Sequence, residues 1–279
     1  MRLLAPAAIA VTLLASIASA QTLERIEQNK ALNIGFRSDA APLSFVNDEG
    51  HPAGYAPNLC AAVAQGIANR LKMTELNVNF VEVDTQNRFD KVAAGEVDIL
   101  CGAATITLSR RDTVDFSVPT YVDGTGVLLP QGGASGFADL AGRTVGVRSD
   151  TTTETALTNS LEAAGIEART ERFTSHKAGF DALRNREIDA YFADQSILLH
   201  EFVTRDMASG YVLSPEILTV EKQGLALARG DSDFRLMVDT ILAELFQSGE
   251  VERIFAATLP GVEPGVALKA MFLTSPTLP

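Results

Sequence analysis

The chain has 279 residues, of which 46% are hydrophobic, and its formal net charge at pH 7 is -12. A chain of this length and composition can bury a large core, as one large domain or as two smaller ones. The acidic balance makes nucleic acids and anionic membrane surfaces poor partners, so a local cluster of arginines is a candidate site for an anion.

The segment 1–20 has the pattern of a cleavable secretory signal. It carries a positive charge at Arg2, a short apolar run and the small residues Ala18-Ser19-Ala20. The apolar run is shorter than the roughly 20 residues of a membrane-spanning helix, and Gln21 rather than a lipid-accepting cysteine follows the small residues. We therefore expect cleavage after Ala20 and a mature protein that is free in the periplasm.

The first half of the mature chain alternates between strand and helix patterns. In chain order we expect a strand at 32–36, a helix capped by Asn58, a strand at 78–83, a helix at 88–94 that ends at Gly95, and a strand at 97–101. A short, continuous apolar run such as 97–101 is typical of a buried parallel strand. This order of elements predicts an α/β lobe.

The same pattern restarts after 140–143 and predicts a second α/β lobe. Its expected elements are a strand at 144–147, a helix from about 151 to 164 that ends at Gly165, a helix at 179–186 and a strand at 188–194. Two apolar segments, 126–129 and 224–228, flank this lobe, and we expect them to be two crossings that form a hinge. A final helix is expected at 233–255, and the tail after Pro260 carries no functional pattern.

These expectations divide the chain into lobes. Lobe 1 takes 21–125 and, after the chain returns, 224–260; lobe 2 takes 126–223; and 261–279 is a tail.

The two cysteines, Cys60 and Cys101, belong to a chain that is expected to enter an oxidising compartment. A disulfide between them would close a loop of about 40 residues and stabilise the fold by about 3–4 kcal/mol. Two buried free thiols are the alternative. The three histidines, His51, His176 and His200, lie far apart, and there is no Gly-rich phosphate loop, so we expect neither a metal nor a cofactor.

The stretch 87–117 carries the clearest functional pattern. It joins a helix to a buried strand and then to a turn that holds Thr105 and Arg110. A hydroxyl and a guanidinium in one turn can hold a carboxylate together. The stretch therefore predicts a receptor for a small acid.

Several short motifs occur in one order along nearly the whole mature chain. They are I-G-F-R-S at 34–38 followed by Pro42, T-Q-N-R at 85–88, C-G-A-A-T at 101–105 followed by Arg110, D-F-S at 115–117, A-D-L-A-G at 138–142, T-T at 151–152, His176 and Asp194. Through this set the chain resembles the amino-acid-binding proteins of bacterial ABC importers, and among them most closely the glutamate/aspartate-binding proteins.

The resemblance implies an α/β fold of the two-lobe periplasmic-binding-protein type (type II), with two α/β lobes joined by two hinge strands. It also implies a monomer that is not an enzyme, that captures an amino acid by hinge closure, and that presents it to the membrane permease subunits of an importer.

The resemblance further implies contacts for an amino-acid zwitterion. Thr105 and Arg110 would hold the α-carboxylate together with the helix N-terminus near Thr152, where the helix dipole favours an anion. Asp194 would accept the α-ammonium. The alternatives are that Arg110 is a solvated charge beside Arg111, that Thr152 is a surface residue, and that Asp194 is only a helix cap.

The side-chain end of the implied pocket is basic. Arg37 and Arg88 correspond to groups that hold an acidic side chain, and His176 matches a further contact. An arginine fork suits a second carboxylate because it supplies both charge and fixed donors. The alternative is that these arginines pair with the protein's own acids, such as Asp84 or Asp39.

The chain also departs from the family pattern. Ala40 and Thr85 stand where relatives have aromatic rings, although Thr85 stays among the implied ligand contacts. Ala103 stands where a serine is expected and keeps a backbone contact only. Asp150 replaces a glycine, so it could cap the next helix or repel the ligand, and Arg148 could offset Asp150 or reach the ligand.

Two other functions stay open. A dehydratase of prephenate-like diacids on the same fold would use an acid in the cleft, for which Glu154 is the nearest candidate. A ligand-binding partner of a separate membrane sensor is the second.

Overall fold

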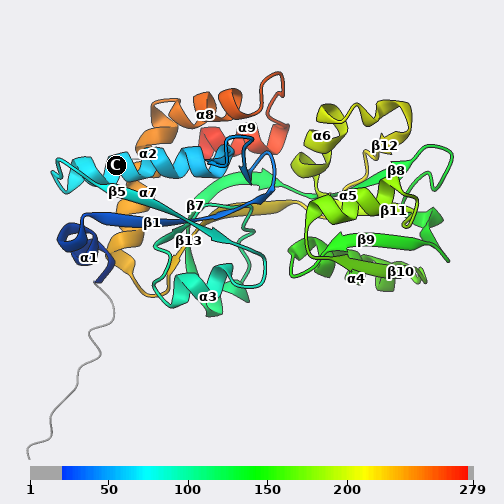
Figure 1. The fold of residues 1–279 in the computed structure, drawn as a ribbon, viewed down its shortest axis with the longest axis horizontal. Helices are drawn as coiled ribbons and strands as arrows, with labels where there is room; N and C mark the ends of the chain where they lie inside the picture. The colour runs from blue at the N-terminus through cyan, green and yellow to red at the C-terminus, as the bar shows by residue number, and fades with distance from the viewer. Residues whose placement is uncertain (1–20, 276–279) are drawn as a thin grey trace, which may run out of the picture.

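The computed structural model describes residues 21–275, so the expected signal at 1–20 lies outside the described residues. Two lobes lie side by side, each built on its own five-stranded sheet (Figure 1). The strand orders are β5-β1-β6-β13-β7 in lobe 1 and β10-β9-β11-β8-β12 in lobe 2. In each sheet one strand, β13 in lobe 1 and β8 in lobe 2, runs antiparallel to the other four, and it is the fourth in the order, so the two lobes repeat one arrangement.

Lobe 1 contains both ends of the described chain. Its strands are β1 (Ala31–Arg37), β5 (Asn77–Val83), β6 (Ile99–Leu100), β7 (Val114–Asp123) and β13 (Glu221–Ala228), with a small sheet of β2 (Asp39–Ala40), β3 (Ser44–Val46) and β4 (Pro52–Ala53). Its helices are α1 (Gln21–Asn29), α2 (Tyr55–Arg70), α3 (Arg88–Ala93), α7 (Ser232–Gln247), α8 (Glu250–Thr258) and α9 (Val266–Thr274).

Lobe 2 is formed by the middle of the chain. Its strands are β8 (Thr125–Pro130), β9 (Thr144–Arg148), β10 (Arg169–Phe173), β11 (Ala190–Asp194) and β12 (Tyr211–Leu213). Its helices are α4 (Thr152–Ala164), α5 (His176–Arg184) and α6 (Gln195–Thr204), with short 3-10 helices at Phe137–Leu140 and Met207–Ser209; a further 3-10 helix, Arg110–Asp112, lies in lobe 1 between β6 and β7.

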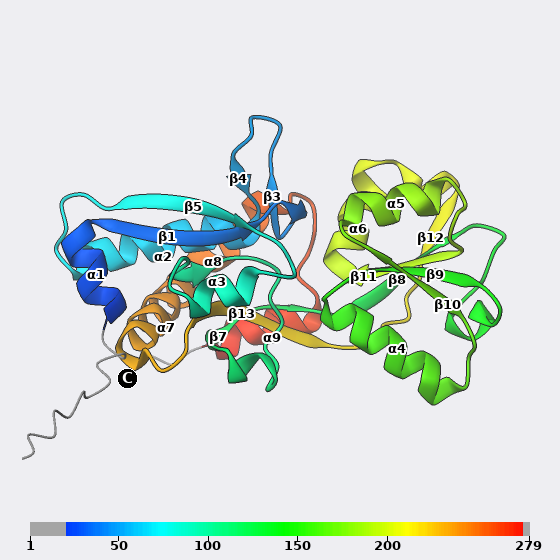
Figure 2. The same cartoon turned by 60° about the horizontal axis from the view of Figure 1, so that its bottom comes forward.

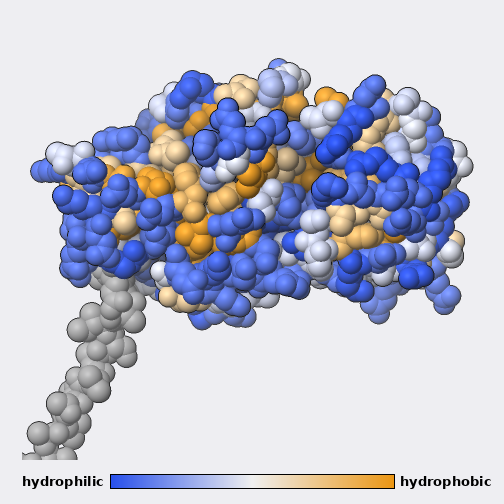
Figure 3. Space-filling view, viewed as in Figure 1, coloured by the Kyte–Doolittle hydropathy of each residue, from blue (hydrophilic) through white to orange (hydrophobic). Residues whose placement is uncertain are grey.

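The inner strands β8, β11 and β13 are buried on two faces, which explains their apolar runs, whereas the edge strands β5 and β10 are mainly exposed or half-buried. In β11, Tyr191 and Ala193 pack towards α5 and α6, whereas Ala190 and Phe192 pack towards α4. The views from two sides show α4 on one face of this sheet and α5 with α6 on the other (Figures 1 and 2). On the face of the molecule drawn in Figure 3 the surface is largely hydrophilic, and apolar residues gather mainly over lobe 1.

Two helices differ from the sequence expectation. Helix α2 begins at Tyr55 with Gly54 at its N-cap, so Asn58 lies inside the helix and does not cap it. Pro57 is tolerated there because the first turn of a helix needs no donor from it. The single helix expected at 233–255 is two helices, since the chain turns at Gly249, which has a left-handed φ of 75°.

The tail expected to carry no pattern contains α9, which packs against β7 and buries Leu268, Met271 and Phe272. No helix in the described range 21–275 is both long and apolar enough to cross a membrane.

The chain passes between the sheets just before the two segments expected to be crossings. It enters lobe 2 at Gly124, between β7 and β8, and returns through 214–220, between β12 and β13. The segments 126–129 and 224–228 are apolar because they lie inside the sheets as parts of β8 and β13.

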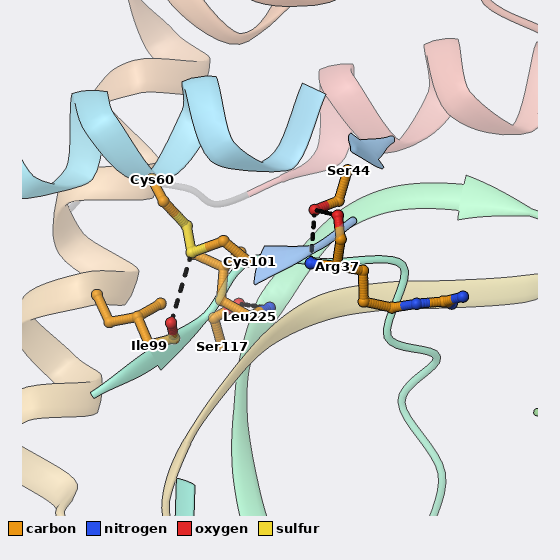
Figure 4. The surroundings of a disulfide bond; sticks show 7 residues. All are labelled: Arg37, Ser44, Cys60, Ile99, Cys101, Ser117 and Leu225. Carbon is orange, nitrogen blue, oxygen red and sulfur yellow. Dashed lines mark hydrogen bonds between the residues drawn. A yellow bond between two sulfur atoms is a disulfide. The ribbon is translucent and has the colours of Figure 1, made fainter. Parts of the chain in front are cut away.

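The expected disulfide between Cys60 and Cys101 is confirmed, and both residues are fully buried. It ties α2 to the end of β6 (Figure 4). The same view shows Ser44 beside the backbone of Arg37, where its hydroxyl accepts the Arg37 N–H at 2.9 Å and donates to the Arg37 carbonyl at 3.0 Å. The guanidinium of Arg37 points away from the disulfide, towards lobe 2.

Candidate ligand-binding site between the lobes

A cleft of about 950 Å³ opens between the lobes, next to the two crossings. Lobe 1 lines it with Thr85, Thr105 and Arg110, lobe 2 lines it with the start of α4, and Glu221 lies at the crossing. Figure 2 shows that α4 begins at the junction of the lobes. Ligands commonly bind beside the carboxyl ends of parallel strands in such sheets, and Thr105 and the first residues of α4 follow β6 and β9.

The hydroxyls expected to hold a carboxylate do hold one, but it belongs to the protein. Thr105 and Thr152 each donate to Oε2 of Glu221 at 2.6 Å, and their hydroxyl oxygens lie 3.2 Å apart. The other oxygen, Oε1, accepts from Thr219 at 2.6 Å and from Thr125 at 3.3 Å. Glu221 carries no motif, so sequence reasoning missed it.

Arg110 lies beside this cluster. Its Nη1 donates to the carbonyl of Thr105 at 2.7 Å, and its guanidinium carbon lies 5.0 Å from the ring centre of Phe89. Burial lowers the pKa of Arg110, and the charges of Glu221 and Asp194 oppose that shift. Arg110 is therefore a half-buried group of the cleft wall. It is not the fully solvated charge of the alternative interpretation.

Arg88 does not itself line the cleft; it is a buried cation without an acidic partner at ion-pair distance in the part of the chain that the structure describes. Only 2% of it is exposed, and its Nη atoms reach the carbonyls of Ala103 and Asp150 at 3.4 Å. Its Nε and the nearby hydroxyl of Thr85 have no hydrogen-bond partner among the described residues. Burial, and then the charges of Arg37 and Arg110, lower the pKa of Arg88 well below its ordinary value.

The expected alternative partner of Arg88, Asp84, accepts the backbone N–H groups of Gln86 and Asn87 instead. Arg88 begins α3, and its aliphatic part places the guanidinium carbon 4.9 Å from the ring centre of Phe89. A buried charge without a close ion-pair partner is costly, and the charge of Asp194 opposes the lowering of the Arg88 pKa without cancelling it.

Arg37, in contrast, pairs with a native acid, as the alternative interpretation proposed. Its Nη2 and Nε donate to Oδ1 of Asp39 at 2.6 and 3.0 Å. The other oxygen of Asp39 accepts from Nε of Arg148, in lobe 2, at 3.1 Å. Burial raises the pKa of Asp39, but Arg37, His176 and Arg148 outweigh it and hold that pKa well below its usual range.

Arg148, expected either to offset Asp150 or to reach the ligand, pairs with Asp39 of lobe 1 in this structure. The side chain of Asp150 is exposed, and Thr151 rather than Asp150 caps α4, by accepting the Glu154 N–H at 3.2 Å. Glu154 itself pairs with Arg172 and accepts the Asp150 N–H at 2.9 Å.

His176 begins α5 and is buried. Its Nδ1 lies 3.0 Å from the hydroxyl of Tyr191, and burial lowers its pKa to about 3, with Arg37 adding to the effect. His176 therefore offers a neutral ring near neutral pH. It lies beside Asp39 in a second cavity and does not line the cleft that contains Thr105.

Asp194 ends β11 and stands at the N-cap of α6, but its side chain makes no capping bond. Its carboxylate accepts from Gln223 at 2.8 Å and from Thr153 at 3.3 Å. Burial, followed by the charge of Glu221, raises its pKa to about 6. The neighbouring Asp123 has a pKa raised to about 8, by burial and by Asp194. Each of these two buried carboxyls therefore holds its proton more tightly than an exposed carboxyl does.

Within the described residues, no group of three or more His, Cys, Asp or Glu side chains is placed to hold a metal ion.

Residues 32–259 match the family described as "Bacterial extracellular solute-binding proteins, family 3". The chain is 27% identical over 239 residues to the "Glutamate/aspartate import solute-binding protein" of Salmonella typhimurium, covering 85% of this chain and 79% of that protein. It is 28% identical over 264 residues to the "L-glutamate/L-aspartate-binding protein" of Pseudomonas aeruginosa, covering 90% and 87%.

Among solved structures, a histidine-bound substrate-binding protein of an ABC uptake transporter from Streptococcus pneumoniae matches with a TM-score of 0.76 at 19% identity. The match covers 87% of this chain and 97% of that one. This likeness concerns the fold alone, and it confirms the expected two-lobe type II architecture.

Proposed function

We propose that the chain captures glutamate or aspartate in the periplasm for the permease of an ABC importer. It belongs to the bacterial extracellular solute-binding proteins of family 3. Its relatives from Salmonella typhimurium and Pseudomonas aeruginosa are described as glutamate/aspartate-binding proteins, which supports an acidic amino acid as the ligand. The periplasmic location further requires the signal expected at 1–20.

The observation that carries the proposal is Arg88, which has no ion-pair partner among residues 21–275. A buried guanidinium with only two long bonds to carbonyls, and with Nε unpartnered, gains most from a bound anion. Arg37 does not show the same need, because Asp39 already neutralises it. We therefore assign Arg88, with the hydroxyl of Thr85, to the side-chain carboxylate of the ligand.

The remaining groups suit the α-carbon of an amino acid. Arg110, Thr105 and Thr152 would hold the α-carboxylate, and Asp194 would accept the α-ammonium. These groups come from both lobes, so a ligand that touches all of them favours the closed arrangement over an open one through its differential contacts. Binding by closure needs no chemical step.

Calorimetry on the mature chain, stripped of ligand by unfolding and refolding with the disulfide intact, tests the proposal. The titrants are L-glutamate, L-aspartate, L-glutamine, succinate and L-arginine. We expect tight binding of the two acidic amino acids only. Binding of L-glutamine alone would refute the role of Arg88, binding of succinate alone would refute the zwitterion contacts, and binding of L-arginine alone would refute an acidic ligand.

A further inference from the structure

Glu221 joins parts of the molecule that lie far apart in the sequence. Its carboxylate accepts hydrogen bonds from Thr105 in lobe 1, from Thr152 in lobe 2, and from Thr219 and Thr125 beside the two crossings. Thr105 is held next to this carboxylate because it forms an isolated β-bridge with Gln223 on the neighbouring strand β13. The cluster is therefore a built anion site whose anion is the protein's own.

The protons of the cluster limit what else it can bind. A threonine hydroxyl has one proton to donate, and both Thr105 and Thr152 point theirs at Oε2 of Glu221, at 2.6 Å. Neither hydroxyl can donate to a second carboxylate while these bonds exist. Two carboxylates in one site also disfavour each other when both are ionised.

We propose that the carboxylate of Glu221 competes with the α-carboxylate of the ligand for the hydroxyls of Thr105 and Thr152. The ligand must displace Glu221 from both threonines in order to bind. This inference rests on the proposed function. Thr219 and Thr125 bond the other oxygen, Oε1, so the side chain keeps partners as Oε2 gives way. Glu221 thereby sets the affinity of the site and selects ligands whose α-carboxylate recovers the lost bonds.

The other acids that line the cleft do not have this role. Glu154 is engaged by Arg172 and the Asp150 N–H, and the side chain of Asp150 is exposed. Glu154 is thus a matched control, because its replacement removes the same charge from the same cleft and leaves the two threonine hydroxyls untouched.

The test is calorimetry on Glu221→Ala, Glu221→Gln and Glu154→Ala with two ligands. L-Glutamate has the α-carboxylate, whereas L-isoglutamine replaces it with an amide and keeps the ammonium and the side-chain carboxylate. We expect Glu221→Ala to bind L-glutamate at least about 10-fold more tightly than Glu154→Ala does, because a hydrogen bond to a charged group contributes at least that factor. For L-isoglutamine, Glu221→Ala should bind less than about 3-fold more tightly than Glu154→Ala does.

Glu221→Gln, which keeps the shape of the side chain, serves if Glu221→Ala does not fold, and a thermal melt followed by circular dichroism reports folding. Tight binding of L-glutamate by the unmodified protein with unchanged or weaker binding by both Glu221 variants would overturn the competition and keep the proposed function. An equal gain for both ligands would also overturn it. Absence of L-glutamate binding by the unmodified protein and by every variant would overturn the proposed function itself, and the inference with it.

Discussion

Replacing Arg88 with methionine should change ligand affinity and ligand-free stability in opposite directions. Methionine keeps an unbranched apolar chain beside Phe89 and removes the guanidinium, which is 2% exposed and has no acidic partner among the described residues. The ligand-free protein loses an uncompensated buried charge, so its free energy of unfolding should rise by about 1–3 kcal/mol.

A gain of this size corresponds to a Tm that is higher by about 2–10 °C for a chain of this length. Binding of L-glutamate loses a charge-assisted contact to the side-chain carboxylate, which costs about 2–5 kcal/mol, or about 30- to 4,000-fold in Kd. Thermal melts followed by far-UV circular dichroism measure the first effect, since the chain has no tryptophan, and calorimetry measures the second.

Arg37→Met is the matched control. It removes an equally buried guanidinium that does have a partner, and it leaves Asp39 with Arg148 alone. The ligand-free Tm should therefore fall. If Arg88→Met melts as far below the unmodified protein as Arg37→Met does, Arg88 is already satisfied without a ligand and the argument for an anion site fails.

Three further changes have expected outcomes. The pKa of Asp194 is raised to about 6, and only the ionised carboxylate pairs with an ammonium group. The affinity for L-glutamate, measured by calorimetry, should therefore fall as the pH drops from about 7 to 5. A flat profile would remove Asp194 from the ligand contacts. Replacing both Cys60 and Cys101 with alanine should lower the free energy of unfolding in urea by about 4 kcal/mol. The reason is that a disulfide between residues 41 positions apart no longer constrains the unfolded chain. An unchanged free energy of unfolding would contradict this account. A Cβ on Gly124 would lie 2.2 Å from the carbonyl oxygen of Thr219, so Gly124→Ala should push the two crossings apart and weaken L-glutamate binding by about 10-fold or more; unaltered binding would show that the crossings adjust freely.

The sequence by itself determined the alternation of strands and helices. Apolar runs and glycines located β1, β5, β9 and α4 within a residue or two, because these patterns depend on neighbours a few positions apart. It also predicted the disulfide, with two free thiols as the alternative, and the structure confirms the bond. Where local patterns compete, as at Pro57 or Gly249, the expected helix ends were wrong.

Only the tertiary structure decided which charges are satisfied within the protein. Arg37 and Arg88 look alike in the sequence, yet Arg37 pairs with Asp39 and Arg88 has no acidic partner among the described residues. Glu221 meets Thr105 and Thr152 across 116 and 69 positions of the chain. Ion pairs and hydrogen bonds act over a few ångströms in space, and the pairing of Thr105 with Gln223 and the packing of lobe 2 beside the crossings, rather than any local pattern, bring the two threonines within that distance of Glu221.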